Sequence, residues 1–312
     1  MSTATSDQSS KPESRNLMES ADSQTYIDRA IELAIAEDLG LRNEGDITSS
    51  AIMGDDSVAS AVVLLKEPGV VAGLDIFTRV MNRYSDEIKL EVLIAEGSYV
   101  DDENLPRKPL PIIRIVGPSA AILAAERVAL NLIQRMSGVA TMTKRFVDKA
   151  APYRIAILDT RKTTPCLRVF EKYAVASAGG TNHRMGLFDC ILIKENHIRV
   201  AGGISNAIQA CRKKFPEKPV EVEVTTYDEV EEALSNNAEK ILLDNMAPAM
   251  VRECVSKVQG RSKIEVSGGI NLSNIDRYLI DGIDYISIGA LTHSVKAIDL
   301  SLEILDISTV EK

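Results

Sequence analysis

Short apolar runs recur through the second half of the chain and alternate with segments of helical periodicity. The runs are Ile155–Thr160, Ile191–Lys194, Val220–Val224, Ile241–Asp244, Ile264–Ser267 and Ile286–Gly289. The intervening helical segments include Ser205–Lys214, Tyr227–Ser235, Pro248–Val258 and Asn271–Ile280. The later runs recur roughly every 22 residues, the rhythm of right-handed βα units in a parallel sheet. Six such strands predict an α/β barrel that falls short of the usual eight.

The first half is a mixed block of helices and strands without a βαβ rhythm. It predicts a helix over Tyr26–Ile35 with Gly40 as its cap, a strand over Ala59–Leu65, and a helix over Leu74–Tyr84. Strands over Lys89–Ala95 and Pro111–Val116 flank a charged loop, Asp101–Pro109, and two helices follow Gly117-Pro118, the second over Ala140–Lys149.

We therefore expect four parts along the chain. Residues 1–23 form a polar, disordered tail, 24–130 an N-terminal domain, and 131–293 the barrel. Residues 294–312 are expected to form a C-terminal helix that leaves the barrel and returns to the N-terminal domain.

The charge balance narrows the classes of ligand. The 312 residues carry a net charge of −9, which argues against nucleic acid or anionic membranes as general partners. No apolar run reaches the length of about 18 residues needed for a membrane span. The four cysteines show neither metal-type spacing nor a disulfide framework, so we expect a cytoplasmic protein. An anion-binding site would be a local exception to the overall charge.

Such an exception occurs at Asp159–Pro165, where the first apolar run ends. Thr160, Arg161 and Lys162 follow a buried strand there, and the carboxyl ends of parallel strands are where ligands bind in α/β folds. Two adjacent cations with hydroxyl groups predict an anionic ligand.

Alternation along the other strands places further charges on one side. In Val220–Val224 the valines share one face, while Glu221 and Glu223 share the other. The same parity puts Lys194 with Leu192, Asp244 with Leu242, and Glu265 with Ser267, which indicates a polar, mutually neutralising barrel interior. The deeper Glu221 and Glu265 favour a structural ion pair, whereas the strand-end residues Glu223, Asp244 and Lys194 favour chemistry.

Two strand ends that carry glycine and one long loop supply the remaining candidate site residues. Ser267, Gly268 and Gly289 end the last two strands, where backbone N–H groups can hold a phosphate. The crossover after the first strand carries His183 and Arg184, which are suited to donate hydrogen bonds to an anion.

These motifs together resemble quinolinate phosphoribosyltransferases. The likeness rests on Asp159–Pro165, His183-Arg184, Ile193–His197, Glu221–Val224, Leu243–Asn245 and Ser267–Gly269, with Gly45–Thr48 and Glu126-Arg127. It implies an N-terminal α/β sandwich domain, an incomplete parallel barrel of six or seven strands, and a homodimer with an active site shared between subunits. It also implies transfer of a phosphoribosyl group from 5-phosphoribosyl 1-pyrophosphate to quinolinate with Mg²⁺, giving nicotinate mononucleotide, CO₂ and pyrophosphate.

The resemblance also implies a role for each site residue. Arg161, His183, Arg184 and Lys194 would hold the quinolinate carboxylates beside Thr160, and Arg127 would come from the neighbouring subunit. Lys162 would contact phosphate groups, Glu223 and Asp244 would bind ribose and Mg²⁺ and stabilise developing positive charge, and Ser267, Gly268 and Gly289 would hold the 5′-phosphate. Lys162, Lys194, Glu223 and Asp244 are the expected catalytic residues.

Three alternatives remain open on the sequence. A Schiff-base aldolase would use Lys194 or Lys162, a related phosphoribosyltransferase would act on another base, and a non-catalytic nucleotide-binding protein would keep the fold alone. One position departs from the family, because Cys166 stands where glycine is usual, which puts a left-handed backbone there in doubt. We interpret Cys166 as a tolerated small side chain rather than a reactive thiol.

Overall fold

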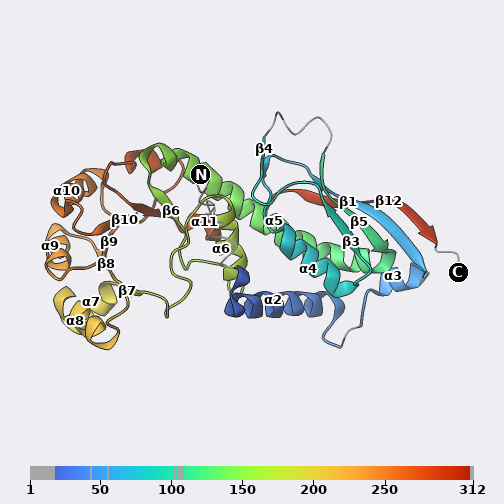
Figure 1. Ribbon diagram of the computed structural model, residues 1–312, viewed down its shortest axis with the longest axis horizontal. Helices are drawn as coiled ribbons and strands as arrows, with labels where there is room; N and C mark the ends of the chain where they lie inside the picture. Colours follow the sequence, from blue (N-terminus) through green and yellow to red (C-terminus); the bar gives the residue numbers. More distant parts are fainter. Residues whose placement is uncertain (1–17, 43, 55, 102, 104–108, 310–312) are drawn as a thin grey trace, which may run out of the picture. The chain divides into compact units, whose positions relative to one another are not determined.

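The computed structural model describes residues 18–42, 44–54, 56–101, 103 and 109–309, and the chain divides into two compact units (Figure 1). The first unit comprises the residues up to Ser137, the segment Val169–Ser177 and the residues from Ala297 onward. The second comprises Gly138–Arg168 and Ala178–Lys296.

A four-stranded antiparallel sheet forms the centre of the first unit. Its strand order is β12-β1-β5-β3, with β1 at Ser57–Leu65, β3 at Lys89–Val92, β5 at Leu110–Pro118 and β12 at Leu300–Thr309. A separate ribbon pairs β2 (Gly69–Val70) with β4 (Tyr99–Val100). The helices of this unit are α2 (Ala21–Leu39), α3 (Ile47–Ile52), α4 (Leu74–Tyr84), most of α6 (Arg168–Ser177) and the first part of α5 (Ser119–Ala150).

Apolar stripes explain why these helices pack. Helix α4 buries Ile76, Phe77 and Val80, and α2 buries Ile27 and Ile31 at the four-residue spacing of one helical face. Removing these side chains from water provides the main free energy that holds helices on a sheet.

The C-terminal segment corrects one expectation, because Leu300–Thr309 is strand β12 and not a helix. It pairs antiparallel with β1 from Leu65↔Leu300 to Ser57↔Thr309. The segment is largely exposed, so the backbone hydrogen bonds offered by the open edge of β1 outweigh its weak helical periodicity.

Three further differences are local. Ala21–Ser23 belong to helix α2 and not to a disordered tail, while residues 1–17 and most of the Asp101–Pro109 loop lie outside the described residues. The two helices expected after Gly117-Pro118 are one helix, α5. The segment Asn271–Ile280 contains only the 3₁₀ turn η2, Ile275–Arg277.

The second unit is built on a six-stranded parallel sheet, which confirms the predicted incomplete barrel. The strand order is β6-β11-β10-β9-β8-β7, so β6 and β7 are the two edges. Its strands are β6 (Ala156–Leu158), β7 (Ile191–Ile193), β8 (Val220–Val224), β9 (Lys240–Asp244), β10 (Lys263–Ser267) and β11 (Tyr285–Ser287). The principal helices are α7 (Glu195–Ala201), α8 (Ile204–Lys214), α9 (Tyr227–Ser235), α10 (Pro248–Val258) and α11 (Ala290–His293), seen with their strands in Figure 1.

Both faces of these strands are covered, as expected for a parallel sheet with crossover helices. On β8, Val220, Glu221 and Val222 are all buried although their side chains alternate between faces. The carboxylate of Glu221 therefore lies in the barrel interior. Among the described residues, no helix combines the length and apolar character that a membrane crossing requires.

Candidate active site

The carboxyl ends of the barrel strands surround a cavity of about 460 Å³. All of its lining residues belong to the second unit. The lining consists of Thr160, Arg161, Lys162, His183, Arg184, Leu192, Lys194, Glu223, Leu242, Asp244, Asn245, Glu265, Ser267, Gly268, Gly269 and Ser287.

Ten of the twelve site residues expected from the sequence line this one cavity. Gly289 lies directly beside it, since a Cβ atom at Gly289 would be 3.0 Å from Lys162 Cδ. Arg127 is different, because it lies in the first unit on helix α5, with its side chain 61% exposed and 3.5 Å from Glu126.

The loop after β6 is held in place by neighbouring groups. The backbone N–H of Lys162 donates to Thr160 Oγ1 at 3.0 Å, and the hydroxyl of Thr292 donates to the Lys162 carbonyl at 2.8 Å. Arg168 donates to Thr163 Oγ1 and to the Met185 carbonyl, both at 2.9 Å, and so connects this loop to the crossover loop.

Asp159 positions the crossover loop from the strand side. Its fully buried carboxylate accepts hydrogen bonds from the His183 N–H at 2.9 Å and the Asn182 side-chain amide at 2.6 Å. Thr181 forms a parallel bridge with Leu158. These contacts hold His183 and Arg184 against the end of β6.

Cations and carboxylates meet inside the cavity. The Lys194 ammonium group pairs with the Glu223 carboxylate from the next strand, and Asp244 accepts a hydrogen bond from Asn245 Nδ2 at 2.7 Å. Within the described part of the chain, neither the guanidinium of Arg161 nor the ammonium of Lys162 has a protein partner. Both cations are therefore available to an anionic ligand.

Below the cavity, one lysine neutralises the two deep carboxylates. Lys240 Nζ lies 2.6 Å from Glu265 and 3.2 Å from Glu221, and His183 Nε2 lies 3.3 Å from Glu221. The expected structural ion pair is thus present, although the sequence reasoning did not identify Lys240 as the partner.

This network moves the two carboxyl pKa values in opposite directions. Burial, together with the Glu221 charge, raises the pKa of Glu265. Burial would also raise the pKa of Glu221, but the hydrogen bond from His183 and the Lys240 charge outweigh it, so that pKa is lowered.

Gly268 has a clear steric requirement. Its φ is +100°, and a Cβ atom there would lie 2.7 Å from the backbone nitrogen of Asn245. Asn245 is itself left-handed, at φ 53°, and its N–H donates to the Ser267 carbonyl at 2.9 Å. Glycine therefore allows the ends of β9 and β10 to approach closely beneath the cavity.

Cys166 stands where the family usually has glycine, which put a left-handed backbone there in doubt. The structure nevertheless has that conformation at Cys166. Its φ is 66°, and the Leu167 N–H donates to the Thr164 carbonyl at 3.1 Å. Pro165 and Cys166 are thus the central residues of a turn with positive φ at its third position, where glycine is normally preferred. The thiol is exposed.

The sequence reasoning missed several residues that position or line the site. Lys240 was missed because it begins a strand, far from the strand end, and Arg168 because a lone arginine carries no pattern. Leu242 shares the strand face of Asp244 and also lines the cavity. Asn245 and Gly269 lie within the motifs that carry the family resemblance but were given no role, and Ser287 was not chosen.

Comparison with known proteins supports a family assignment over both units. The model of the quinolinate phosphoribosyl transferase N-terminal domain matches residues 46–137, and that of the C-terminal domain matches residues 139–303. The chain is 42% identical over 293 residues to a nicotinate-nucleotide pyrophosphorylase (carboxylating), chloroplastic, of Oryza sativa, covering 88% of this chain and 76% of the relative. A probable enzyme of the same name from Bacillus subtilis is 40% identical, with 86% and 90% covered.

Solved structures agree with these relatives. The nicotinate-nucleotide pyrophosphorylase of Francisella tularensis is 38% identical with a TM-score of 0.83, covering 90% of this chain and 96% of that one. NadC from Streptococcus pyogenes is 37% identical with a TM-score of 0.84, covering 91% and 97%. Family models that match residues 46–137 and 139–303, and relatives near 40% identity over most of their length, show that this chain belongs to the quinolinate phosphoribosyltransferase family.

Proposed function

We propose that this chain transfers the phosphoribosyl group of 5-phosphoribosyl 1-pyrophosphate to quinolinate with loss of CO₂. The products are nicotinate mononucleotide, CO₂ and pyrophosphate. Family membership supports the reaction. The observation that carries it is one cavity that holds Arg161 and Lys162, which have no partner among the described residues, together with the carboxylates Glu223 and Asp244.

Quinolinate carries two carboxylates on adjacent ring carbons. The guanidinium groups of Arg161 and Arg184 are suited to bind them, because a planar fork can donate two parallel hydrogen bonds to a carboxylate. Lys194 lines the same cavity and adds a further donor, and His183 and Thr160 also belong to its lining. This set of donors favours a dicarboxylate over a neutral ring.

The phosphoribosyl substrate would occupy the opposite side of the cavity. Ser267, Gly268 and Gly289 would hold the 5′-phosphate, since small residues at strand ends let backbone N–H groups approach an anion. Lys162 would contact the pyrophosphate as a mobile point charge.

The bond changes follow from this arrangement. The C1–oxygen bond of the ribose breaks, pyrophosphate leaves with the electron pair, and the quinolinate nitrogen forms the new bond to C1. Glu223 and Asp244 would stabilise the positive charge that develops on the sugar. The alkylated ring nitrogen is cationic, so it accepts the electrons left when CO₂ departs, and a proton then adds to the ring carbon.

A divalent metal fits the same carboxylates. Mg²⁺ prefers oxygen ligands and is commonly held by one or two carboxylates together with substrate phosphates. Glu223 and Asp244 supply such oxygens, and Mg²⁺ when bound would neutralise charge on the pyrophosphate.

Arg127 leads us to propose that the active enzyme is a homodimer with shared sites. An exposed arginine whose only ion-pair partner among the described residues is Glu126, at 3.5 Å, is available to a second subunit.

We propose a cytoplasmic location on the basis of four free cysteines. Cell fractionation tests this location, because the name of the rice relative places that protein in the chloroplast.

The decisive experiment is to incubate the protein with quinolinate, 5-phosphoribosyl 1-pyrophosphate and Mg²⁺ and to measure nicotinate mononucleotide. Quinolinate should yield product with equimolar CO₂, and nicotinate in its place should be a far poorer substrate. Equal turnover of both bases, or borohydride trapping of a carbonyl substrate on Lys194 or Lys162, would contradict the proposal.

A further inference from the structure

A second cavity, of about 260 Å³, opens at the opposite end of the barrel strands. Residues at the beginnings of strands line it, among them Ile191, Val220 and Lys240. His183 and Arg184 line this cavity as well as the proposed active-site cavity. A ligand bound here would touch residues assigned to quinolinate.

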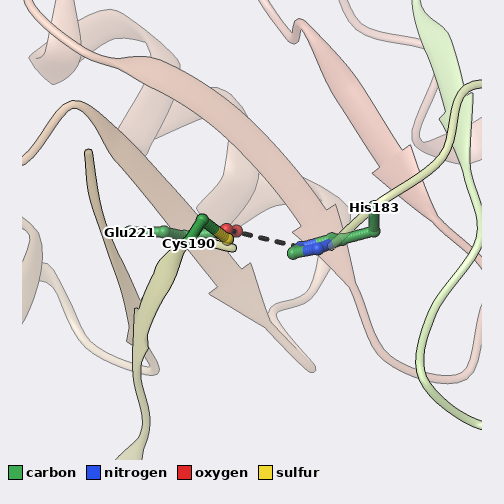
Figure 2. A group of neighbouring side chains, drawn as sticks. All are labelled: His183, Cys190 and Glu221. Carbon is green, nitrogen blue, oxygen red and sulfur yellow. Dashed lines mark ion pairs between the residues drawn. The ribbon is translucent and has the colours of Figure 1, made fainter. Parts of the chain in front are cut away.

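Three side chains with metal-binding atoms converge in the wall of this second cavity. Figure 2 shows His183, Cys190 and Glu221 pointing toward one another, and their ligand atoms all lie within 4.8 Å of one another. His183 Nε2 is already 3.3 Å from Glu221 Oε2. The residues come from three places in the chain: the crossover loop, the approach to β7, and strand β8.

Glu221 has bonding capacity left over in this position. Its side chain is only 4% exposed, and its Oε1 atom has no hydrogen-bond partner among the described residues. A buried carboxylate oxygen without a partner costs free energy, and a metal ion is one way to satisfy it.

We propose that His183, Cys190 and Glu221 form a binding site for a zinc-class divalent cation, distinct from the Mg²⁺ site proposed at Glu223 and Asp244. A nitrogen, a sulfur and a carboxylate oxygen are the ligand types that Zn²⁺ takes in proteins. Metal–ligand bonds of roughly 2.0–2.3 Å place tetrahedral ligand atoms about 3.3–3.8 Å apart. Side-chain rotations that move the ligand atoms by about 1 Å would bring them to this spacing. Water in the cavity supplies the fourth ligand.

The surrounding charges suit a divalent cation. Three carboxylates lie in or beside the cavity wall, those of Glu221, Glu239 and Glu265, and two cations, Lys240 and Arg184. When the Cys190 thiol binds as thiolate and the imidazole is neutral, four negative charges face two positive charges. A divalent cation offsets the excess of two negative charges, which favours its binding to a buried cluster.

Metal binding would also disturb the neighbouring residue. His183 Nδ1 accepts the Arg184 N–H at 2.7 Å, which leaves the ring proton on Nε2. Metal coordination by Nε2 moves that proton to Nδ1, where it faces the Arg184 N–H and breaks the hydrogen bond. Because Arg184 is assigned to quinolinate, the bound metal is expected to inhibit; this consequence alone rests on the proposed function.

The binding test uses the full-length protein, stripped of metal with a chelator, and compares wild type with Cys190→Ser and with the control Cys211→Ser. Calorimetry with ZnCl₂ should give one site per chain in wild type and Cys211→Ser. In Cys190→Ser the Zn²⁺ affinity should fall by more than about tenfold. A tenfold loss is the lower limit seen when a residue that only supports a metal ligand is removed, and removing a ligand itself should cost more. Co²⁺ should produce a thiolate-to-cobalt charge-transfer band in wild type and Cys211→Ser but not in Cys190→Ser.

Cys190→Ala provides a second variant should the serine protein fail to fold, with circular dichroism as the check on both. Equal Zn²⁺ affinity with and without Cys190, or no thiolate band in wild type, overturns the proposal. If the enzyme assay shows the expected activity, Zn²⁺ should inhibit wild type and not Cys190→Ser. If that activity is absent, the calorimetric and optical results still decide the metal site.

Discussion

Lys240 and Glu265 form a 2.6 Å ion pair in the barrel interior, where the Glu265 side chain is fully buried. Because Lys240 also lies 3.2 Å from Glu221, one ammonium group compensates two carboxylates. The floor of the active-site cavity therefore depends on a lysine that begins its strand rather than ends it.

Replacing this lysine should destabilise the fold strongly. Lys240→Met leaves two buried carboxylates without their shared cation, so we expect a loss of about 3–5 kcal/mol in the free energy of unfolding. Lys263 is the matched control, since it stands opposite Lys240 in the register of β9 and β10 but pairs on the surface with Asp284. Lys263→Met should cost less than about 1 kcal/mol in urea unfolding. Equal costs for the two variants would contradict this account.

Neutralising the two glutamates should change the pH dependence of stability in opposite senses. The pKa of Glu265 is raised from 4.5, so its folded form holds a proton more tightly than the unfolded chain does. Wild type should therefore lose stability relative to Glu265→Gln as pH rises above about 4.5 through the raised pKa. The pKa of Glu221 is lowered, so wild type should lose stability relative to Glu221→Gln as pH falls from about 4.5 through the lowered pKa. Urea unfolding in metal-free buffer across this range measures both differences, and parallel pH profiles would refute the assignment.

Substitutions in the two halves of the cavity should weaken the binding of different substrates. Arg184→Ala or Arg161→Ala should weaken quinolinate binding by about 2–4 kcal/mol, roughly 30- to 700-fold, with a much smaller effect on 5-phosphoribosyl 1-pyrophosphate. Lys162→Ala should show the reverse preference. Dissociation constants for each substrate alone test this, and equal losses for both substrates in every variant would argue against the division.

The shared-site proposal predicts recovery in mixed dimers. Arg127→Ala and Lys194→Ala should each be inactive, because one removes the contribution of the neighbouring subunit and the other a group within the cavity. After mixing and subunit exchange, up to about half of the sites in a hybrid dimer would combine two intact contributions. Absence of recovery despite exchange, confirmed by differently tagged subunits, would rule out sharing.

The stability of variants at position 166 should follow how well each residue tolerates a left-handed backbone. Cys166→Asn should be as stable as wild type, because asparagine adopts positive φ readily. Cys166→Val should be less stable by about 1–2 kcal/mol, since a β-branched side chain is strained there. Cys166→Gly should fall within about 1 kcal/mol of wild type, as relief of strain offsets the extra entropy of the unfolded chain. Thermal unfolding of the three variants gives the order, and a valine variant as stable as the asparagine one would contradict it.

The barrel strands and the residues at their ends could be predicted from the sequence. Period-two and helical patterns are local, and the carboxyl ends of parallel strands converge. Arg161, Lys194, Glu223 and Asp244 could therefore be predicted to meet. Resemblance to a family then separated their roles.

Other features depend on contacts between residues distant in sequence, which outweigh local conformational preference and become visible only in the folded chain. Strand β12 forms because β1 offers an open edge more than 230 residues earlier in the chain, and Lys240 reaches Glu265 across a strand register that periodicity does not specify. Likewise, no spacing rule connects His183, Cys190 and Glu221, which come together because the crossover loop folds back along β6. Charge pairing and edge hydrogen bonding act through space, so only the folded chain reveals them.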